Sequence, residues 1–269
     1  MPQRLGAWTD NAGSGGAAVT AGGSANTLGA WTEVIASTPF DAVGVLVMVD
    51  AGQSSSLVLN TLVNIGRGAA SSEQVLIPNL MAGHADGWFA SNMEQSYFFP
   101  LFIPAGTRLS AQAQSVNASR AVEVGIWLVG GSRVPGRWHG NRVTAYGADT
   151  ANSTGTTVTQ GTSPSWSSAV QIAASTANPI RALQMGFDLG ADTTAANRRF
   201  IGRVGVGSST GWFAEGLPFA ESSTEVCYFS GANWLLSQMS FDIQAGSDLR
   251  FSAMGNSAEA RNFILYGVD

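Results

Sequence analysis

Two stretches of the chain share one pattern of alternating apolar and polar residues behind an Ala-Gly turn. Residues 102–113 read FIPAGTRLSAQA, and residues 241–253 read FDIQAGSDLRFSA. In both, three apolar residues follow the turn at every second position: Leu109, Ala111 and Ala113, then Leu249, Phe251 and Ala253. This period is typical of a half-buried antiparallel strand. Its recurrence predicts that one β module is used twice.

The flanks of these stretches repeat as well. A Gly/Ser/Thr-rich lead with Val-Thr-x-Gly precedes a tryptophan in each copy, Trp31 and Trp166, and Ile-Gly-Arg occurs at 65–67 and at 201–203. Strands are expected every 8–15 residues between Gly, Pro and Ser, and no apolar stripe has helical spacing and length. The pattern predicts an all-β fold of two tandem, internally repeated antiparallel β-sandwich domains that are jelly-roll-like.

The predicted boundaries divide the chain into three parts. Residues 1–131 form the first module, whose Gly/Ser/Thr-rich lead is expected to be an extended edge segment. Residues 132–145 form a linker, and residues 146–269 form the second module. The linker contains Trp138 and gathers three arginines: Arg133, Arg137 and Arg142. Two interpretations stay open, a solvated linker and a strip that contacts an acidic neighbour.

The two modules differ on the outward face of their first long strand. Aligning the aspartates that end these strands pairs Leu46 with Gln184. It likewise pairs Met48 with Gly186. A strand that is apolar on both faces must be covered, and the cover could be the other module, a long loop or another subunit. Leu46 and Met48 are therefore candidates for protein contact.

The amino-acid composition excludes several classes of function. The chain has 269 residues with 45% hydrophobic residues, only 12% charged residues and a net charge of −5, whereas about 25% charged residues is usual. A general nucleic-acid binder is not expected. No signal peptide is expected, and no apolar run approaches the roughly 18 residues of a membrane helix. A surface with so little charge suits close contact with neighbours.

The residues that would carry chemistry are sparse. The chain has two histidines, His84 and His139, and a single cysteine, Cys227. Neither histidine has the spacing of a zinc ligand, and no Gly-x-Ser-x-Gly elbow sits between a strand and a helix. We therefore expect no catalytic residues, no metal and no cofactor. The tryptophans are first expected in the core, but on an exposed edge they would stack on sugars. The candidates for glycan stacking are Trp88, Trp212 and Trp234.

The series of motifs resembles virion structural proteins of tailed bacteriophages and related particles, including head-decoration, head-spike and tail-fibre components. The motifs are the Gly/Ser/Thr-rich lead, Val-Thr-x-Gly, the tryptophan, Ile-Ala-x-Thr and the late Ile-Pro-Ala-Gly-Thr-Arg-Leu-Ser-Ala. The resemblance covers most of both modules, and no catalytic or binding residue comes with it. It implies a tandem β-sandwich on a particle surface.

The expected function is therefore a non-enzymatic virion component that decorates or cements a capsid. Its partners would be capsid or tail subunits and further copies of itself, without nucleic acid or membrane. Its place would be the virion, assembled in the host cytoplasm. The alternative is a carbohydrate-binding head-spike or tail-fibre protein that contacts host surface polysaccharide.

Overall fold

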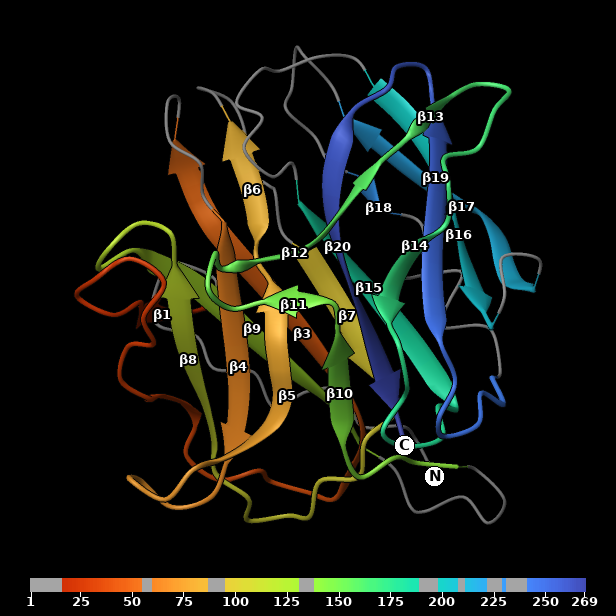
Figure 1. Cartoon of the computed structure of the whole chain (residues 1–269). Helices are drawn as coiled ribbons and strands as arrows, with labels where there is room; N and C mark the ends of the chain where they lie inside the picture. The colour runs from red at the N-terminus through yellow and green to blue at the C-terminus, as the bar shows by residue number, and fades with distance from the viewer. Residues whose placement is uncertain are drawn as a thin grey trace.

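All regular structure in the described part of the chain is β-strand. The structure is a computed structural model and describes residues 16–54, 60–86, 95–130, 138–188, 198–207, 211–221, 229–230 and 241–269. The strands form four sheets, arranged as two neighbouring sandwiches (Figure 1). Among the described residues no helix is long and apolar enough to cross a membrane.

The first module is a jelly roll. Its strands are β1 (Ala17–Thr20), β2 (Thr32–Ile35), β3 (Ala42–Ser54), β4 (Thr61–Arg67), β5 (Gln74–Met81), β6 (Gly83–Asp86), β7 (Gln95–Phe99), β8 (Leu109–Ser115) and β9 (Ala121–Gly130). One sheet has the order β1-β9-β3-β7, with β6 parallel to the far end of β3. The other has the order β2-β8-β4-β5. Apart from β6, this is the strand order of an eight-stranded jelly roll.

The second module repeats this order. Its strands are β10 (Val143–Tyr146), β11 (Ala148–Asp149), β12 (Thr154–Thr159), β13 (Gly161–Thr162), β14 (Val170–Ala173), β15 (Ala182–Asp188), β16 (Arg198–Val206), β17 (Trp212–Glu221), β18 (Phe229–Ser230), β19 (Leu249–Gly255) and β20 (Ala260–Val268). One sheet contains β12-β20-β15 and the other β14-β19-β16-β17. No described strand takes the place of β7. The predicted fold class is confirmed.

The Ala-Gly turn of the first module is held by one threonine. Thr38 Oγ1 donates to the carbonyl of Pro104 at 2.7 Å and accepts from the N–H of Thr107 at 2.9 Å. The N–H of Gly106 donates to the carbonyl of Thr38 at 2.7 Å. Gly106 has a φ of +80°, which glycine adopts without strain. Turn and threonine together form a latch across the end of the sandwich.

The second module builds the same latch from its own residues. Thr176 Oγ1 donates to the carbonyl of Gln244 at 2.9 Å and accepts from the N–H of Ser247 at 3.1 Å. The N–H of Gly246, whose φ is +83°, donates to the carbonyl of Thr176 at 2.7 Å. The two latches are therefore equivalent in their hydrogen bonds.

Strand β20 is buried on both faces and joins the two modules. Phe263 and Leu265 belong to the core of the second module. Ile264, Tyr266 and Val268, on the other face, belong to the core of the first. Figure 1 shows β20 and β15 lying between the two sandwiches. Residues far apart in sequence thus complete one core.

A pair of tyrosines forms the centre of this junction. The rings of Tyr97 and Tyr266 meet edge to face, with centroids 5.4 Å apart. Tyr97 donates to the carbonyl of Met81 at 2.7 Å, and Tyr266 accepts from the N–H of Met81 at 2.9 Å. Tyr266 also donates to the carbonyl of Asn79 at 2.9 Å. Burial raises the pKa of both phenols, so both stay neutral.

The outward residues of β15 face this junction, and both are buried. Gln184 is 2% exposed, and a Cβ added to Gly186 would lie 2.8 Å from the Tyr266 hydroxyl and 2.9 Å from that of Tyr97. By contrast, Leu46 and Met48 are only half-buried. The sequence pattern predicts a cover over these two apolar residues. The surface that the chain itself covers is instead the outward face of β15 in the second module. There Gly186 leaves room for the hydroxyls of Tyr97 and Tyr266.

Candidate functional site

An apolar surface lies on the outward side of the first module. Leu46 on β3 is directly opposite Phe98 on β7 and Trp127 on β9, and Met48 lies two positions further along β3. All four side chains are half-buried, and none belongs to either core. We call these four residues the Leu46 face. It brings the predicted contact residues Leu46 and Met48 together with two aromatic rings that sequence reasoning had not joined to them.

Two carboxylates border the Leu46 face. Asp50, two positions beyond Met48, is paired across the sheet with Glu123 on β9. Burial, and then the charge of Asp50, raise the pKa of Glu123. One Glu123 oxygen is buried and has no hydrogen-bond partner among the described residues. The surface is therefore apolar along most of its length and acidic at one end.

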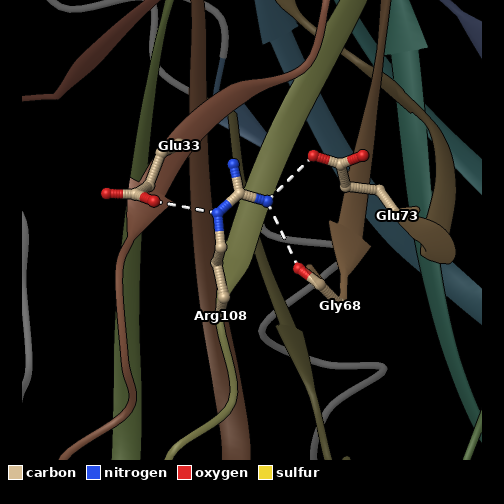
Figure 2. Close-up of polar contacts among 4 residues, drawn as sticks. All are labelled: Glu33, Gly68, Glu73 and Arg108. Carbon is tan, nitrogen blue, oxygen red and sulfur yellow. Dashed lines mark hydrogen bonds and ion pairs between the residues drawn. The ribbon is translucent and has the colours of Figure 1, made fainter. Parts of the chain in front are cut away.

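A cluster of charges lies on the opposite sheet, at the start of β8. Arg108 donates through Nε to Glu33 at 2.8 Å and through Nη1 to Glu73 at 2.8 Å (Figure 2). Nη1 also donates to the carbonyl of Gly68 at 3.3 Å. The Glu73 side chain is 2% exposed, whereas that of Glu33 is 51% exposed. Arg108 is thus held in one orientation from two sides.

These contacts set the protonation states of Arg108 and Glu73. Hydrogen bonds to Glu33 and Glu73 raise the pKa of Arg108. Burial alone would raise the pKa of Glu73, but its own backbone N–H and its hydrogen bond with Arg108 outweigh this and lower it. Arg108 and Glu73 are therefore ionised at neutral pH, and Glu73 is a fixed counter-ion rather than a proton donor.

An open depression of about 560 Å³ lies beside this cluster. We call it the Arg67 pocket. Its lining consists of Arg67, Gly68, Ala69, Ser72, Gln74, Gly106, Thr107 and Arg108. Arg67 lies at the end of β4, and its side chain has no ion pair or hydrogen bond among the described residues. The Nη2 of Arg108 likewise has no partner there.

The second module lacks this chemistry on the same scaffold. Strand pairing puts Val206 at the position of Arg67 and Asp248 at that of Arg108. Asp248 accepts from Arg250 at 2.7 Å. The repeated Ile-Gly-Arg at 65–67 and 201–203, which sequence reasoning had aligned, is therefore not structurally equivalent. The two glutamates of Arg108 also escaped that reasoning, since they lie 75 and 35 residues away. The one available signal was the change from Arg108 to Asp248 in the matched turns.

Trp212, a predicted glycan-stacking residue, lies on the outer sheet of the second module. The guanidinium of Arg203 lies 3.8 Å from the centroid of Trp212 and 4.2 Å from that of Trp166. Burial lowers the pKa of Arg203, and Glu215 at 3.7 Å partly opposes this. One ring face of Trp212 is thus occupied by this chain's own cation. Its role in sugar stacking stays a prediction.

The remaining predicted site residues lie apart from these surfaces. Trp138 is 38% exposed, and Arg142 forms an ion pair with Asp269 at 2.6 Å. An acidic group thus already holds Arg142, while the contact role of the strip stays a prediction. Four further candidates lie outside the described residues: Trp88, Arg133, Arg137 and Trp234. In the described ranges no three His, Cys, Asp or Glu residues are grouped as a metal site would require.

Comparison with known proteins gives likenesses of shape only. No family model matches the chain, and no curated protein matches its sequence. The STIV MCP is 10% identical over 94% of this chain and 96% of that chain, with a TM-score of 0.36. A chain in the atomic structure of Sulfolobus Turreted Icosahedral Virus is 10% identical over 93% of this chain and 88% of that chain, with a TM-score of 0.37.

Other neighbours belong to different kinds of protein. The tandem CBM22-1-CBM22-2 domain of Paenibacillus barcinonensis Xyn10C is 11% identical over 100% of this chain and 91% of that chain, with a TM-score of 0.27. PNGF-II is 8% identical over 89% of this chain, with a TM-score of 0.34, and this chain spans 59% of its length. TM-scores below 0.5 carry no argument about function. The protein is an all-β chain whose structural neighbours include viral capsid proteins.

Proposed function

We propose that the protein is a non-enzymatic virion structural component that decorates or cements a capsid surface. The observation that carries this proposal is the Leu46 face, where four adjacent apolar side chains remain half-buried on the outside of a sheet. Aromatic and Met side chains at the centre of a patch are the residues that protein interfaces favour. Its partners would be capsid or tail subunits and further copies of this chain.

The joined modules suit such a role. Because β20 contributes to both cores, the two sandwiches present their outer surfaces in a fixed relation. Charged residues are only 12% of the chain, so neighbouring copies repel each other weakly. The module boundaries at 1–131, 132–145 and 146–269 remain part of this proposal.

The test replaces Leu46 with Gln and Met48 with Gly in one variant. The second module carries Gln184 and Gly186 at the matching strand positions, so both residues are compatible with this kind of strand. Loss of two central apolar contacts should cost at least about 2 kcal/mol of association, which is roughly 30-fold in affinity. Quantitative binding of the purified chain to particles that lack it measures the effect.

The matched control replaces two exposed apolar residues outside the Leu46 face, Leu28 and Val75, with Gln. Their replacement should leave particle occupancy unchanged. Thermal unfolding checks that both variants fold. If the Leu46 and Met48 variant occupies particles as fully as the wild type, the proposed contact surface is wrong.

The alternative is a carbohydrate-binding head-spike or tail-fibre protein. What favours it is the pair Trp166 and Trp212, two half-buried rings that both lie against the guanidinium of Arg203. A glycan array built from host surface polysaccharides would show binding that Trp212→Ala abolishes. An array without signal would count against this alternative.

A further inference from the structure

The Arg67 pocket has the volume of a small-ligand site, with a lining that is more polar and more exposed than is usual for one. Its volume of about 560 Å³ falls within the roughly 300–1,000 Å³ of such sites. Ser72, Gln74 and Thr107 offer hydroxyl and amide groups around the two arginines, and Ala69 is the one apolar side chain in the lining. Ser72 and Gln74 make no side-chain hydrogen bond among the described residues. The lining therefore suits a ligand with many hydroxyl groups.

The charges of the pocket select the anion. Glu33 and Glu73 both pair with Arg108, whereas Arg67 forms no ion pair among the described residues. The two arginines and two glutamates sum to zero charge, so the neighbouring glutamates oppose a doubly charged phosphate more than a monoanion such as a carboxylate. The Nη2 of Arg108 forms no bond within the described part of the chain, and the two glutamates fix its position. A carboxylate could thus accept from Arg67 and from Arg108 Nη2 together.

Comparison of the two modules supports a ligand-binding role for Arg67 rather than a structural one. The second module keeps the same latch and strand pairing with Val206 and Asp248 at these positions. Gly207 donates its N–H to the carbonyl of Asp248 at 2.9 Å, just as Gly68 does to that of Arg108 at 3.2 Å. The fold at this corner therefore does not need Arg67.

We infer that the Arg67 pocket binds a carboxylated sugar, with Arg67 and Arg108 on the carboxylate and with Ser72, Gln74 and Thr107 on the hydroxyl groups. The site lies on a different sheet from the Leu46 face and does not depend on it. This inference goes beyond the proposed function, because a particle component with such a pocket would also hold an acidic saccharide. The Arg67 pocket is also a different site from the one around Trp166 and Trp212 in the second module.

The experiment titrates the full chain with methyl glucuronide, methyl glucoside and acetate. Calorimetry and NMR chemical shifts measure the binding of each compound. Methyl glucuronide should bind with a dissociation constant in the millimolar range or tighter, at least about 10-fold more strongly than either comparison compound. Its affinity should fall as salt is added, because the charged contact is partly exposed.

Arg67→Val, which introduces the residue of the second module, should weaken methyl glucuronide at least about 10-fold while the chain keeps its thermal stability. The control is Arg181→Val, which removes the same charge from an exposed position in the second module. Gln74→Ala should weaken methyl glucuronide but leave acetate unchanged.

Several results would overturn the inference. If methyl glucoside binds as tightly as methyl glucuronide, the carboxylate has no role in binding. If acetate binds as tightly as methyl glucuronide, the sugar ring has no role. Unchanged affinity in Arg67→Val would place the ligand elsewhere. Binding of a short glutamate peptide in preference to methyl glucuronide would replace the sugar with a protein partner. None of these results bears on particle occupancy, which tests the proposed function separately.

Discussion

Gly186 shows how a missing side chain sets the contact between two modules. An added Cβ would lie 2.8 Å from the Tyr266 hydroxyl, 2.9 Å from the Tyr97 hydroxyl and 3.1 Å from the Cβ of Met81. Real Cβ atoms do not approach polar atoms so closely, so a larger residue must displace the tyrosines. Both hydroxyls hold the backbone of β5, and their displacement would break those bonds as well.

Gly186→Ala should therefore destabilise the protein by about 1–3 kcal/mol, the range for overpacking a core. Thermal unfolding should show a fall of several degrees, at roughly 2–4 °C for each kcal/mol in a chain of this size. Gly23→Ala is the control, since nothing lies within 4 Å of its added Cβ. Equal stability of Gly186→Ala and the wild type would mean that the tyrosines do not set this contact.

At the scale of elements, the two latches offer a direct test of equivalence. Thr38 and Thr176 are each 2% exposed, and each hydroxyl satisfies one backbone carbonyl and one backbone N–H. Replacement by Val keeps the shape but removes both bonds of the threonine hydroxyl, while each carbonyl keeps its bond from the hydroxyl of Thr107 or Ser247. A hydrogen bond within a protein contributes about 0.5–1.5 kcal/mol of stability.

Thr38→Val and Thr176→Val should consequently lower the free energy of unfolding by similar amounts, within about 1 kcal/mol of each other. Thr38→Ser and Thr176→Ser keep the hydroxyl and should cost less. Urea unfolding of the four variants measures this. A large loss for one valine variant beside none for the other would show that the latches differ in strength.

The strands were predictable from sequence because their signals are local. In each module, the alternating residues lie within a dozen positions of the Ala-Gly turn, at Gly106 in the first module and at Gly246 in the second. The alignment of Arg67 with Arg203 was wrong because structural equivalence depends on which residue each faces across a ladder. Arg67 lies opposite Leu109, whereas Arg203 lies opposite Ser252. Such pairings join strands some 40 residues apart or more, and no local motif reports them.

The surfaces were harder to predict than the strands. Sequence pattern identifies Leu46 and Met48 as outward and apolar, but it cannot say which face another part of the chain will cover. The cover over Gly186 depends on two tyrosines, one from each module. The Arg67 pocket depends on a loop and a turn that meet only in three dimensions.

For the whole molecule, the shared core predicts that the two modules unfold together. Ile264 and Leu265 are neighbours on β20, but Ile264 packs into the first core and Leu265 into the second. Ile264→Ala and Leu265→Ala should each cost about 2–5 kcal/mol. Calorimetry should show a single transition that both variants lower. Two transitions, with each variant moving a different one, would show that the modules are thermodynamically independent.

The double burial of β20 also has a consequence for synthesis. Ile264 follows the end of β9 by about 130 residues, so at about 5–20 residues per second the ribosome delivers it roughly 7–26 seconds after the last strand of the first jelly roll. Throughout that interval the first jelly roll lacks the side chains that close its core beside Tyr97 and Met81. The nascent chain thus carries an unfinished, apolar opening, and a chaperone or a neighbouring nascent chain can reach it before β20 arrives.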